Sequence, residues 1–497
     1  MPLGSPEEEI GGIPFGVKII KGCLPPDKRG RTDALQPLTL ILTYVAYLFF
    51  CISRTPINVL QMKILHECNA SLFANRTYTL HEGSHTWCEG RVFEKDAQSF
   101  MYIFGSLFWI SYGICLYFSG IIADTFNPRY FLTFGSFMAS FFMVVLGLSN
   151  LWQIAEIHFF YMSIILYAAA QSTAWPVLLN TATHWYAGKR NGLFFSLWNT
   201  HRYVGSIVGI LITSAYIEGV WGTAFFIPAV FVAIIAIVVF LFFIAHPVDL
   251  SFMDELSTSD SKTEELPPWL DNRRTIEFVE ALKVPGVVEF SACMFFSRMV
   301  SFFFLFWRPA YLMEMGKKTV QDIAIYSLPY TIGGFCGGVL IGVLKDYFKK
   351  NAIICVSFLL LSIPAILFQT FGVEDIPYLD IFLQILVGIF VEAPYILLST
   401  SVSVDLGMNS LLRRNNRGLA TVAAIVEGTG AIGSAMGPFV IIAISDAKKW
   451  TYTMYMMIAM EVFSALCLSR MVLKEYKDAV LRSRMGDYWF KGSTGGI

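Results

Sequence analysis

Runs of about 20 apolar residues recur along almost the whole chain, and a helix needs about that many to cross a bilayer. Charged residues make up 15% of the 497 positions, whereas soluble domains carry about 25%. These features predict an all-α integral membrane protein. The predicted spans are roughly 36–62, 99–123, 130–149, 153–180, 191–217, 222–245, 286–312, 321–344, 352–372, 377–403, 418–444 and 450–472.

The Lys and Arg residues predict the orientation of these spans. With the N-terminus in the cytoplasm, the inner segments carry 24 of them and the outer loops 8. Both termini are therefore expected in the cytoplasm, as tails over 1–35 and 473–497. The four remaining basic residues lie inside predicted spans, and they are Arg54, Arg202, Arg298 and Arg308.

The first outer loop, 63–98, carries two signals of an oxidising compartment. Asn69 and Asn75 each begin an Asn-x-Ser/Thr sequon, and we expect glycosylation of at least one. Cys68 and Cys88 lie in the same polar segment, so a disulfide between them is predicted.

The two halves of the chain resemble each other across an acidic linker at 246–285. "GIIADTFNPRY" follows the second span and "GVLKDYFKKN" follows the eighth, which places Asp124 and Asp346 at equivalent positions. Parallel repeats of six helices, 36–245 and 286–472, are the architecture of the major facilitator superfamily, with substrate bound between the halves. We expect Asp124 with Arg129, and Asp346 with Lys350, to act as inner gates.

Arg54 and Arg298 are the first candidate ligands. An arginine at the centre of a membrane costs about 2.5 to 3.5 kcal/mol on insertion scales, so it usually faces a cavity and has a function. Snorkelling to the surface is the alternative for Arg54, which lies past the middle of its span. One arginine from each half would form a clamp for an oxyanion such as phosphate.

Three more residues lie at similar depth. His201 can change its charge near neutral pH, which suits phosphate binding or proton coupling, although a structural histidine is the alternative. Its neighbour Arg202 is expected to face the cavity or a carboxylate between helices. Glu427 aligns with His201 in the repeat and is expected to pair with a basic residue when the site is empty, with proton carriage as the alternative. Arg308, near the outer end of its span, is expected at the mouth.

Several function classes find no support. The nine cysteines show no CxxC pair or Cys/His cluster at zinc spacing, so no metal or cofactor is predicted. The 36 basic and 37 acidic residues leave no basic face for nucleic acid. The sequence has no GxSxG, Walker A or HExxH motif, and an enzyme is not expected.

Four stretches resemble the eukaryotic sugar-phosphate exchangers of solute carrier family 37, which are organophosphate:phosphate antiporters of the major facilitator superfamily. These stretches begin at "SRTPINVL", "QSTAWPVLL", "ALKVPGVVEF" and "EAPYILLST". The resemblance implies exchange of glucose 6-phosphate or glycerol 3-phosphate for inorganic phosphate, commonly across the endoplasmic reticulum membrane.

The same resemblance implies roles for single residues. Arg54 matches the family's phosphate-binding arginine in the first helix, and His201 its fifth-helix histidine. Arg298 stands where related exchangers carry a lysine, and the second arginine of the bacterial relatives falls near Ser301. Thr55, Arg202 and Glu427 depart from the family pattern, which leaves the substrate preference open.

We therefore predict a twelve-helix antiporter that works by alternating access, with phosphate held by Arg54, Arg298 and His201. Two other functions remain open. One is a proton-coupled or uniporting carrier of another organic anion. The other is a transport-inactive binding or scaffold protein, which would have an accessory membrane subunit as its partner. The chain carries no KDEL-type or dilysine ending. Lysosomal or plasma membranes therefore remain alternatives to the endoplasmic reticulum.

Overall fold

The protein is described by a computed structural model. It describes residues 14–20, 25, 28–73, 97–152, 154, 156–186, 191–216, 220–247, 278–308, 326–370, 377–408, 418–445 and 450–493. Within these ranges the regular structure is helical, and the predicted all-α fold is confirmed.

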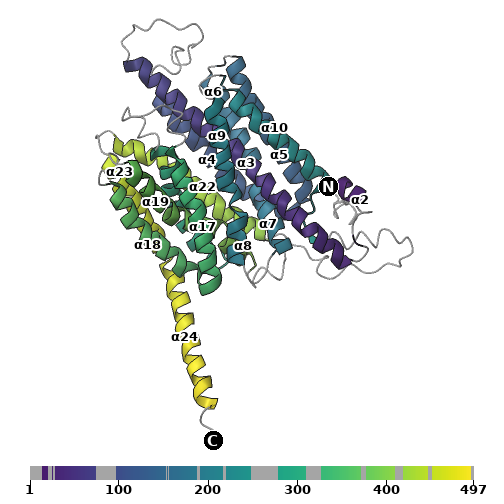
Figure 1. The fold of residues 1–497 in the computed structure, drawn as a ribbon, viewed down its shortest axis with the longest axis vertical. Helices are drawn as coiled ribbons and strands as arrows, with labels where there is room; N and C mark the ends of the chain where they lie inside the picture. The colour runs from purple at the N-terminus through teal and green to yellow at the C-terminus, as the bar shows by residue number, and fades with distance from the viewer. Residues whose placement is uncertain are drawn as a thin grey trace, which may run out of the picture.

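The helices form two groups that follow the two predicted halves (Figure 1). The first group contains α2 (Phe15–Ile20), α3 (Lys28–Phe73), α4 (Ala97–Thr125), α5 (Pro128–Leu151), α6 (Ile157–Gln171), α7 (Ala174–Tyr186), α8 (Asn191–Trp198), α9 (His201–Tyr216) and α10 (Thr223–Phe242). The second contains α13 (Phe278–Leu282), α14 (Val287–Phe302), η3 (Phe303–Trp307), α17 (Leu328–Phe348), α18 (Asn351–Thr370), α19 (Pro377–Leu397), η5 (Leu398–Val402), α20 (Ser403–Gly407), α22 (Leu419–Ser445), α23 (Trp450–Cys467) and α24 (Ser469–Ser493).

Ten of the described helical segments are long and apolar enough to cross a membrane, and the bent pair Thr451–Cys467 and Ser469–Leu481 adds an eleventh. The predicted fifth span differs because it is divided. A turn at Asn199 and Thr200 separates α8 from α9, and each helix is too short to qualify alone. Asn and Thr are weak helix formers, since their side chains compete for backbone hydrogen bonds.

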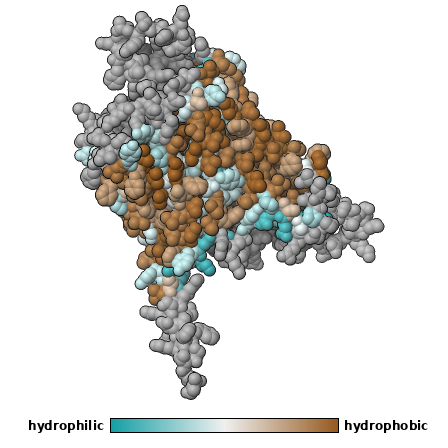
Figure 2. Space-filling view, viewed as in Figure 1, coloured by the Kyte–Doolittle hydropathy of each residue, from teal (hydrophilic) through white to brown (hydrophobic). Residues whose placement is uncertain are grey.

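The outer surface is apolar, as a lipid-facing bundle requires. Figure 2 shows hydrophobic residues covering most of the visible described surface. Among them are large side chains that would be buried in a soluble protein, for example Phe118 at 63% exposed, Phe134 at 63% and Phe368 at 64%. Polar side chains are instead gathered inside, which fits a membrane protein with a polar centre.

Helices α3 and α24 extend beyond the predicted spans. Helix α3 continues to Phe73 and so includes Cys68 and Asn69, but the structure does not describe their side chains. Asn75 and Cys88 lie outside the described residues. The predicted cytoplasmic tail contains most of α24, which projects away from the bundle (Figure 1).

The two halves meet closely at the predicted cytoplasmic end. A Cβ added to Gly120 on α4 would lie 2.5 Å from the Cβ of Ala424 on α22. A Cβ on Gly192 of α8 would lie 2.5 Å from the carbonyl oxygen of Gly342 on α17. The helix pairs α4 and α22, and α8 and α17, are equivalent in the repeat. Each pair therefore brings its backbones together at glycine positions.

Candidate functional site

Three arginines from both halves of the bundle converge at its centre. Arg54 on α3 and Arg202 on α9 belong to the first half, and Arg298 on α14 belongs to the second. They are 8%, 7% and 7% exposed. Guanidinium groups are costly to bury without a compensating anion, so this convergence needs a functional explanation.

Two tyrosine rings separate the three guanidinium groups. The ring of Tyr47 lies 5.4 Å from Cζ of Arg54 and 5.6 Å from Cζ of Arg202. The ring of Tyr395 lies 4.7 Å from Cζ of Arg202 and 4.1 Å from Cζ of Arg298. Arg202 therefore stands between Arg54 and Arg298, and the π faces partly compensate the buried charges.

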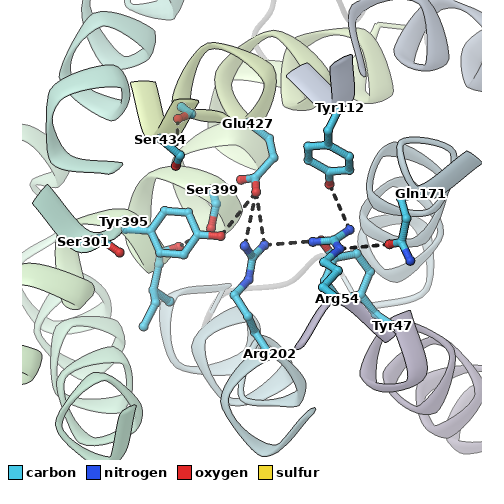
Figure 3. A network of polar contacts seen from close by, with 12 residues as sticks. Tyr47, Arg54, Tyr112, Gln171, Arg202, Ser301, Tyr395, Ser399, Glu427 and Ser434 are labelled. Carbon is cyan, nitrogen blue, oxygen red and sulfur yellow. Dashed lines mark hydrogen bonds and ion pairs between the residues drawn. The ribbon is translucent and has the colours of Figure 1, made fainter. Parts of the chain in front are cut away.

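Arg54 is held by hydrogen bonds within its own half (Figure 3). Its Nε donates to Oε1 of Gln171 at 2.9 Å, and its Nη atoms donate to the hydroxyls of Tyr47 at 3.4 Å and Tyr112 at 3.3 Å. The Gln171 amide donates in turn to Ser53 Oγ at 2.8 Å, which fixes its orientation. All these partners are neutral, so Arg54 keeps its full charge.

Arg202 and Glu427 connect the two halves. Nη1 and Nη2 of Arg202 lie 3.2 and 3.3 Å from Oε1 of Glu427 on α22. The Tyr395 hydroxyl donates to the same oxygen at 3.2 Å (Figure 3). Oε2 of Glu427 has no hydrogen-bond partner among the described residues. The predicted pairing of Glu427 with a basic residue is thus present, and Arg202 supplies that residue.

Arg298 is the least engaged of the three. It packs over Tyr395 and lies 5.3 Å from the ring of Trp109, which belongs to the other half. Its guanidinium has no hydrogen bond or ion pair with any described residue. Its planar set of N–H donors is therefore available to an incoming oxyanion.

His201 lies beside this centre in an aromatic box. Its ring centroid is 4.7 Å from those of Tyr47 and Trp198 and 5.4 Å from that of Tyr44. The side chain is fully buried, and neither ring nitrogen has a partner among the described residues. Its predicted role as a phosphate ligand stays a prediction.

Arg308 lies apart from the centre, at the opposite end of the bundle from the gates. It forms an ion pair with Asp380 on α19, whose other oxygen accepts from Gln384 at 2.9 Å. Both members of this pair are buried and belong to the second half. The pair ties helices within one half.

The two aspartates predicted to act as gates cap helices of the opposite half. Asp124, at the end of α4, accepts from the backbone N–H of Thr421 at 2.9 Å and from its hydroxyl at 2.6 Å. Asp346, near the end of α17, accepts from the N–H groups of Gly192 and Leu193 at 2.8 Å each. The first N–H groups of a helix lack internal partners and favour anions, so each carboxylate is well placed to hold the halves together.

The basic partners predicted for these gates lie elsewhere. Arg129 contacts the hydroxyl of Tyr130 at 2.9 Å and forms no ion pair with a described residue, and neither does Lys350. Lys345 instead pairs with Asp405 at 2.9 Å within the second half. The pairing of Asp124 with Arg129 and of Asp346 with Lys350 stays a prediction.

Several residues of the site were not predicted from the sequence. They are Tyr47, Tyr112, Gln171, Tyr395 and a buried carboxylate, Glu392. The aromatic ones have no distinguishing pattern, because aromatic residues occur both in the core and on the exposed surface of this protein. Glu392 did carry a signal, since it is an isolated charged residue in an apolar run, whereas Gln171 opens a short polar stretch with Ser172 and Thr173.

Comparison with known proteins agrees with this fold. Residues 93–410 match the family model described as Major Facilitator Superfamily. The glucose-6-phosphate exchanger SLC37A2 of Danio rerio is 32% identical over 460 residues, which cover 88% of this chain and 92% of the relative. The exchanger SLC37A1 of Mus musculus is 31% identical over 524 residues, covering 93% and 96%. The chain belongs to the SLC37 family.

Solved structures support the fold of this SLC37 protein. The human organic anion transporter MFSD10 superimposes with a TM-score of 0.63 at 14% identity, covering 87% of this chain and 99% of that one. A bacterial homologue of the human lysosomal transporter Spinster gives 0.58 at 16% identity, covering 88% and 98%. The predicted fold of the major facilitator superfamily is confirmed, and the SLC37 protein is a multi-pass membrane protein.

Proposed function

We propose that this SLC37 protein is an antiporter that exchanges a phosphate ester, such as glucose 6-phosphate or glycerol 3-phosphate, for inorganic phosphate. One observation carries the proposal. Three buried guanidinium groups from both halves converge at the centre. Glu427 is hydrogen-bonded to one of them, that of Arg202. The names of the relatives, glucose-6-phosphate exchangers, agree with it.

The charges favour a phosphate group over a neutral solute. Arg54 and Arg298 have no carboxylate partner among the described residues, so the centre has a positive excess that an anion would neutralise. A phosphate monoester carries about two negative charges near neutral pH and three acceptor oxygens. Arginine binds such oxygens in a planar, bidentate way, so groups from two halves can grip different faces of one phosphate.

Exchange follows from competition at Arg202. Arg202 is neutralised by Glu427 across the halves. A bound phosphate would compete for the guanidinium and loosen this connection, and it would lower the barrier for the two halves to rock. Asp124 and Asp346 would release their helix ends as the predicted cytoplasmic side opens. A carrier without substrate that keeps the Arg202–Glu427 pair would change slowly between its two conformations. Substrate would therefore have to be carried in each direction in turn, which is exchange.

Counterflow in proteoliposomes tests the proposal. Vesicles loaded with phosphate should take up labelled glucose 6-phosphate or glycerol 3-phosphate, and Arg54→Ala should abolish the uptake. Arg470→Ala is the matched control, because Arg470 is an exposed arginine that pairs with Glu289 far from the centre. Uptake driven by a pH gradient without internal phosphate would instead favour a proton-coupled carrier. Binding of phosphate esters without counterflow would favour a transport-inactive protein.

A further inference from the structure

Glu392 on α19 is a second carboxylate in the centre of the bundle, and its surroundings differ from those of Glu427. It is 3% exposed. Its Oε2 accepts from the Tyr203 hydroxyl at 3.0 Å, and its Oε1 accepts from the Tyr330 hydroxyl at 2.9 Å and from Ser301. Every partner of this carboxylate is thus a neutral hydroxyl group.

Glu392 lies directly beside the arginine centre. Tyr203 follows Arg202 on α9. These consecutive residues of the first half contact two carboxylates of the second half, Arg202 that of Glu427 and Tyr203 that of Glu392. Ser301 stands three positions after Arg298 on α14, and Tyr395 stands three positions after Glu392 on α19. Residues three apart share one helix face about one turn apart. The Cα atoms of Arg298 and Ser301 are therefore about 5 Å apart along α14, which places the hydroxyl cluster one helix turn from Arg298.

The backbone is shaped to admit this cluster. A Cβ added to Gly334 on α17 would lie 2.7 Å from the Tyr203 ring and 3.0 Å from Cγ of Glu392. The absence of a side chain at Gly334 is what allows Tyr203 to reach across from the first half.

We propose that Glu392, with Tyr203, Ser301 and Tyr330, forms the subsite for the hydroxyl groups of the organic part of the substrate. The inference rests on the proposed function. A carboxylate accepts about four hydrogen bonds, and neighbouring hydroxyls of a sugar or polyol supply such donors in pairs. Substrate hydroxyls would replace those of the protein while the phosphate lies at the arginines, so the two ends of the ester are told apart.

The charge of Glu392 also sets the substrate class. A neutral polyol phosphate satisfies the carboxylate, whereas a phosphate ester with a second anionic group, such as 3-phosphoglycerate, places like charges together. The subsite therefore selects hexose or polyol phosphates and rejects phosphorylated acids.

Substrate panels in proteoliposomes test this assignment. Glu392→Gln should raise the apparent KM for glucose 6-phosphate about tenfold, because a charged acceptor is lost, and leave phosphate:phosphate exchange within about twofold. Uptake of 3-phosphoglycerate relative to glucose 6-phosphate should increase. Tyr330→Phe, which keeps the ring, should shift the same ratio more weakly. Glu461→Gln, a fully buried glutamate on α23, is the matched control and should leave it unchanged.

A substrate series separates binding from a structural role. In the wild type, removal of a single hydroxyl from glucose 6-phosphate should raise the KM for at least one deoxy analogue, and Glu392→Gln should remove that difference. If Glu392→Gln slows phosphate:phosphate and sugar-phosphate exchange by the same factor, Glu392 acts only in holding the two halves together, and the subsite is overturned. An unchanged substrate ratio would also overturn it. Failure of the wild type to exchange any phosphate ester would be a different result, since it would overturn the proposed function.

Discussion

The Arg202 guanidinium and the Glu427 carboxylate, 3.2 Å apart, form an ion pair between the two halves of the bundle at its centre. The residues come from α9 and α22, so the pair must break or rearrange whenever those helices separate. It lies between Arg54 and Arg298, where the substrate phosphate is proposed to bind.

Removal of the competing carboxylate should tighten phosphate binding. In Glu427→Gln, Arg202 is free to contact the phosphate, and we expect the apparent KM for phosphate to fall about threefold to tenfold. The maximal exchange rate should fall as well, because a more tightly held ligand leaves slowly. Initial rates of phosphate:phosphate exchange over a range of concentrations measure both. A higher KM in Glu427→Gln would show that the carboxylate does not compete with the ligand.

The pair also predicts non-additive mutants. Arg202→Ala leaves Glu427 buried without its cation, so we expect a loss of exchange of about 100-fold or more. The double variant Arg202→Ala/Glu427→Ala removes both charges and should exchange faster than Arg202→Ala alone. Additive losses would mean that the two residues act independently.

The gate aspartates should control the conformation of the predicted cytoplasmic end. Asp124→Asn and Asp346→Asn each weaken a helix cap worth about 1 kcal/mol, which shifts a conformational equilibrium about fivefold. Spin labels at the exposed positions Tyr130 and Tyr347, one in each half, should report longer distances in both variants.

Asp405→Asn is the control for that measurement. Asp405 pairs with Lys345 and accepts from Asn351 inside the second half, so its removal breaks no connection between halves. The label distances should then match the wild type. Unchanged distances in Asp124→Asn and Asp346→Asn would contradict a gating role.

Gln171 should act as a positioning residue for Arg54. Its amide oxygen accepts from Arg54 Nε at 2.9 Å, so Gln171→Leu leaves that donor unpaired and the guanidinium free to rotate. We expect the apparent KM for phosphate to rise about tenfold. Gln171→Glu should be worse, because the new carboxylate would neutralise Arg54. Gln36→Leu, which removes a glutamine bonded to the Trp185 carbonyl far from the site, should leave KM unchanged.

The orientation and the first outer loop can be tested together. The Lys and Arg distribution predicts that Asn69 and Asn75 face the lumen. The protein expressed in a eukaryotic cell should therefore shift in electrophoretic mobility on treatment with endoglycosidase H, and Asn69→Gln/Asn75→Gln should lose the shift. A faster band in non-reducing gels that disappears in Cys88→Ser would support the predicted disulfide with Cys68. No shift in the wild type would argue against lumenal glycans.

Most of the fold follows from hydropathy and the internal repeat. The apolar runs mark the membrane helices because every backbone polar group in a bilayer must be bonded within its helix. The break at Asn199 and Thr200 was missed, since hydropathy averages over a window longer than one turn. The repeat placed Asp124 and Asp346 at equivalent positions. It did not reveal that each caps a helix of the opposite half, because that contact depends on how the halves pack.

The sequence identifies the three central arginines of the candidate site. Arg54, Arg202 and Arg298 stand out because a buried cation in a membrane is expensive, and that reasoning depends on each residue alone. The order of the three along two tyrosine rings depends on helix rotation, which the sequence does not specify. A buried carboxylate in a membrane is also energetically costly. The same reasoning, applied to acidic side chains as well as to arginines, identifies Glu392.

Equilibrium binding of labelled phosphate to the purified protein tests the central claim most directly, that three arginines from both halves form one oxyanion site. The wild type should bind phosphate with a single affinity. Arg54→Ala, Arg202→Ala and Arg298→Ala should each weaken it by about tenfold or more, while Arg308→Lys, which keeps the charge beside Asp380, should leave it unchanged. Wild-type affinity in any one of the three alanine variants would contradict a shared site.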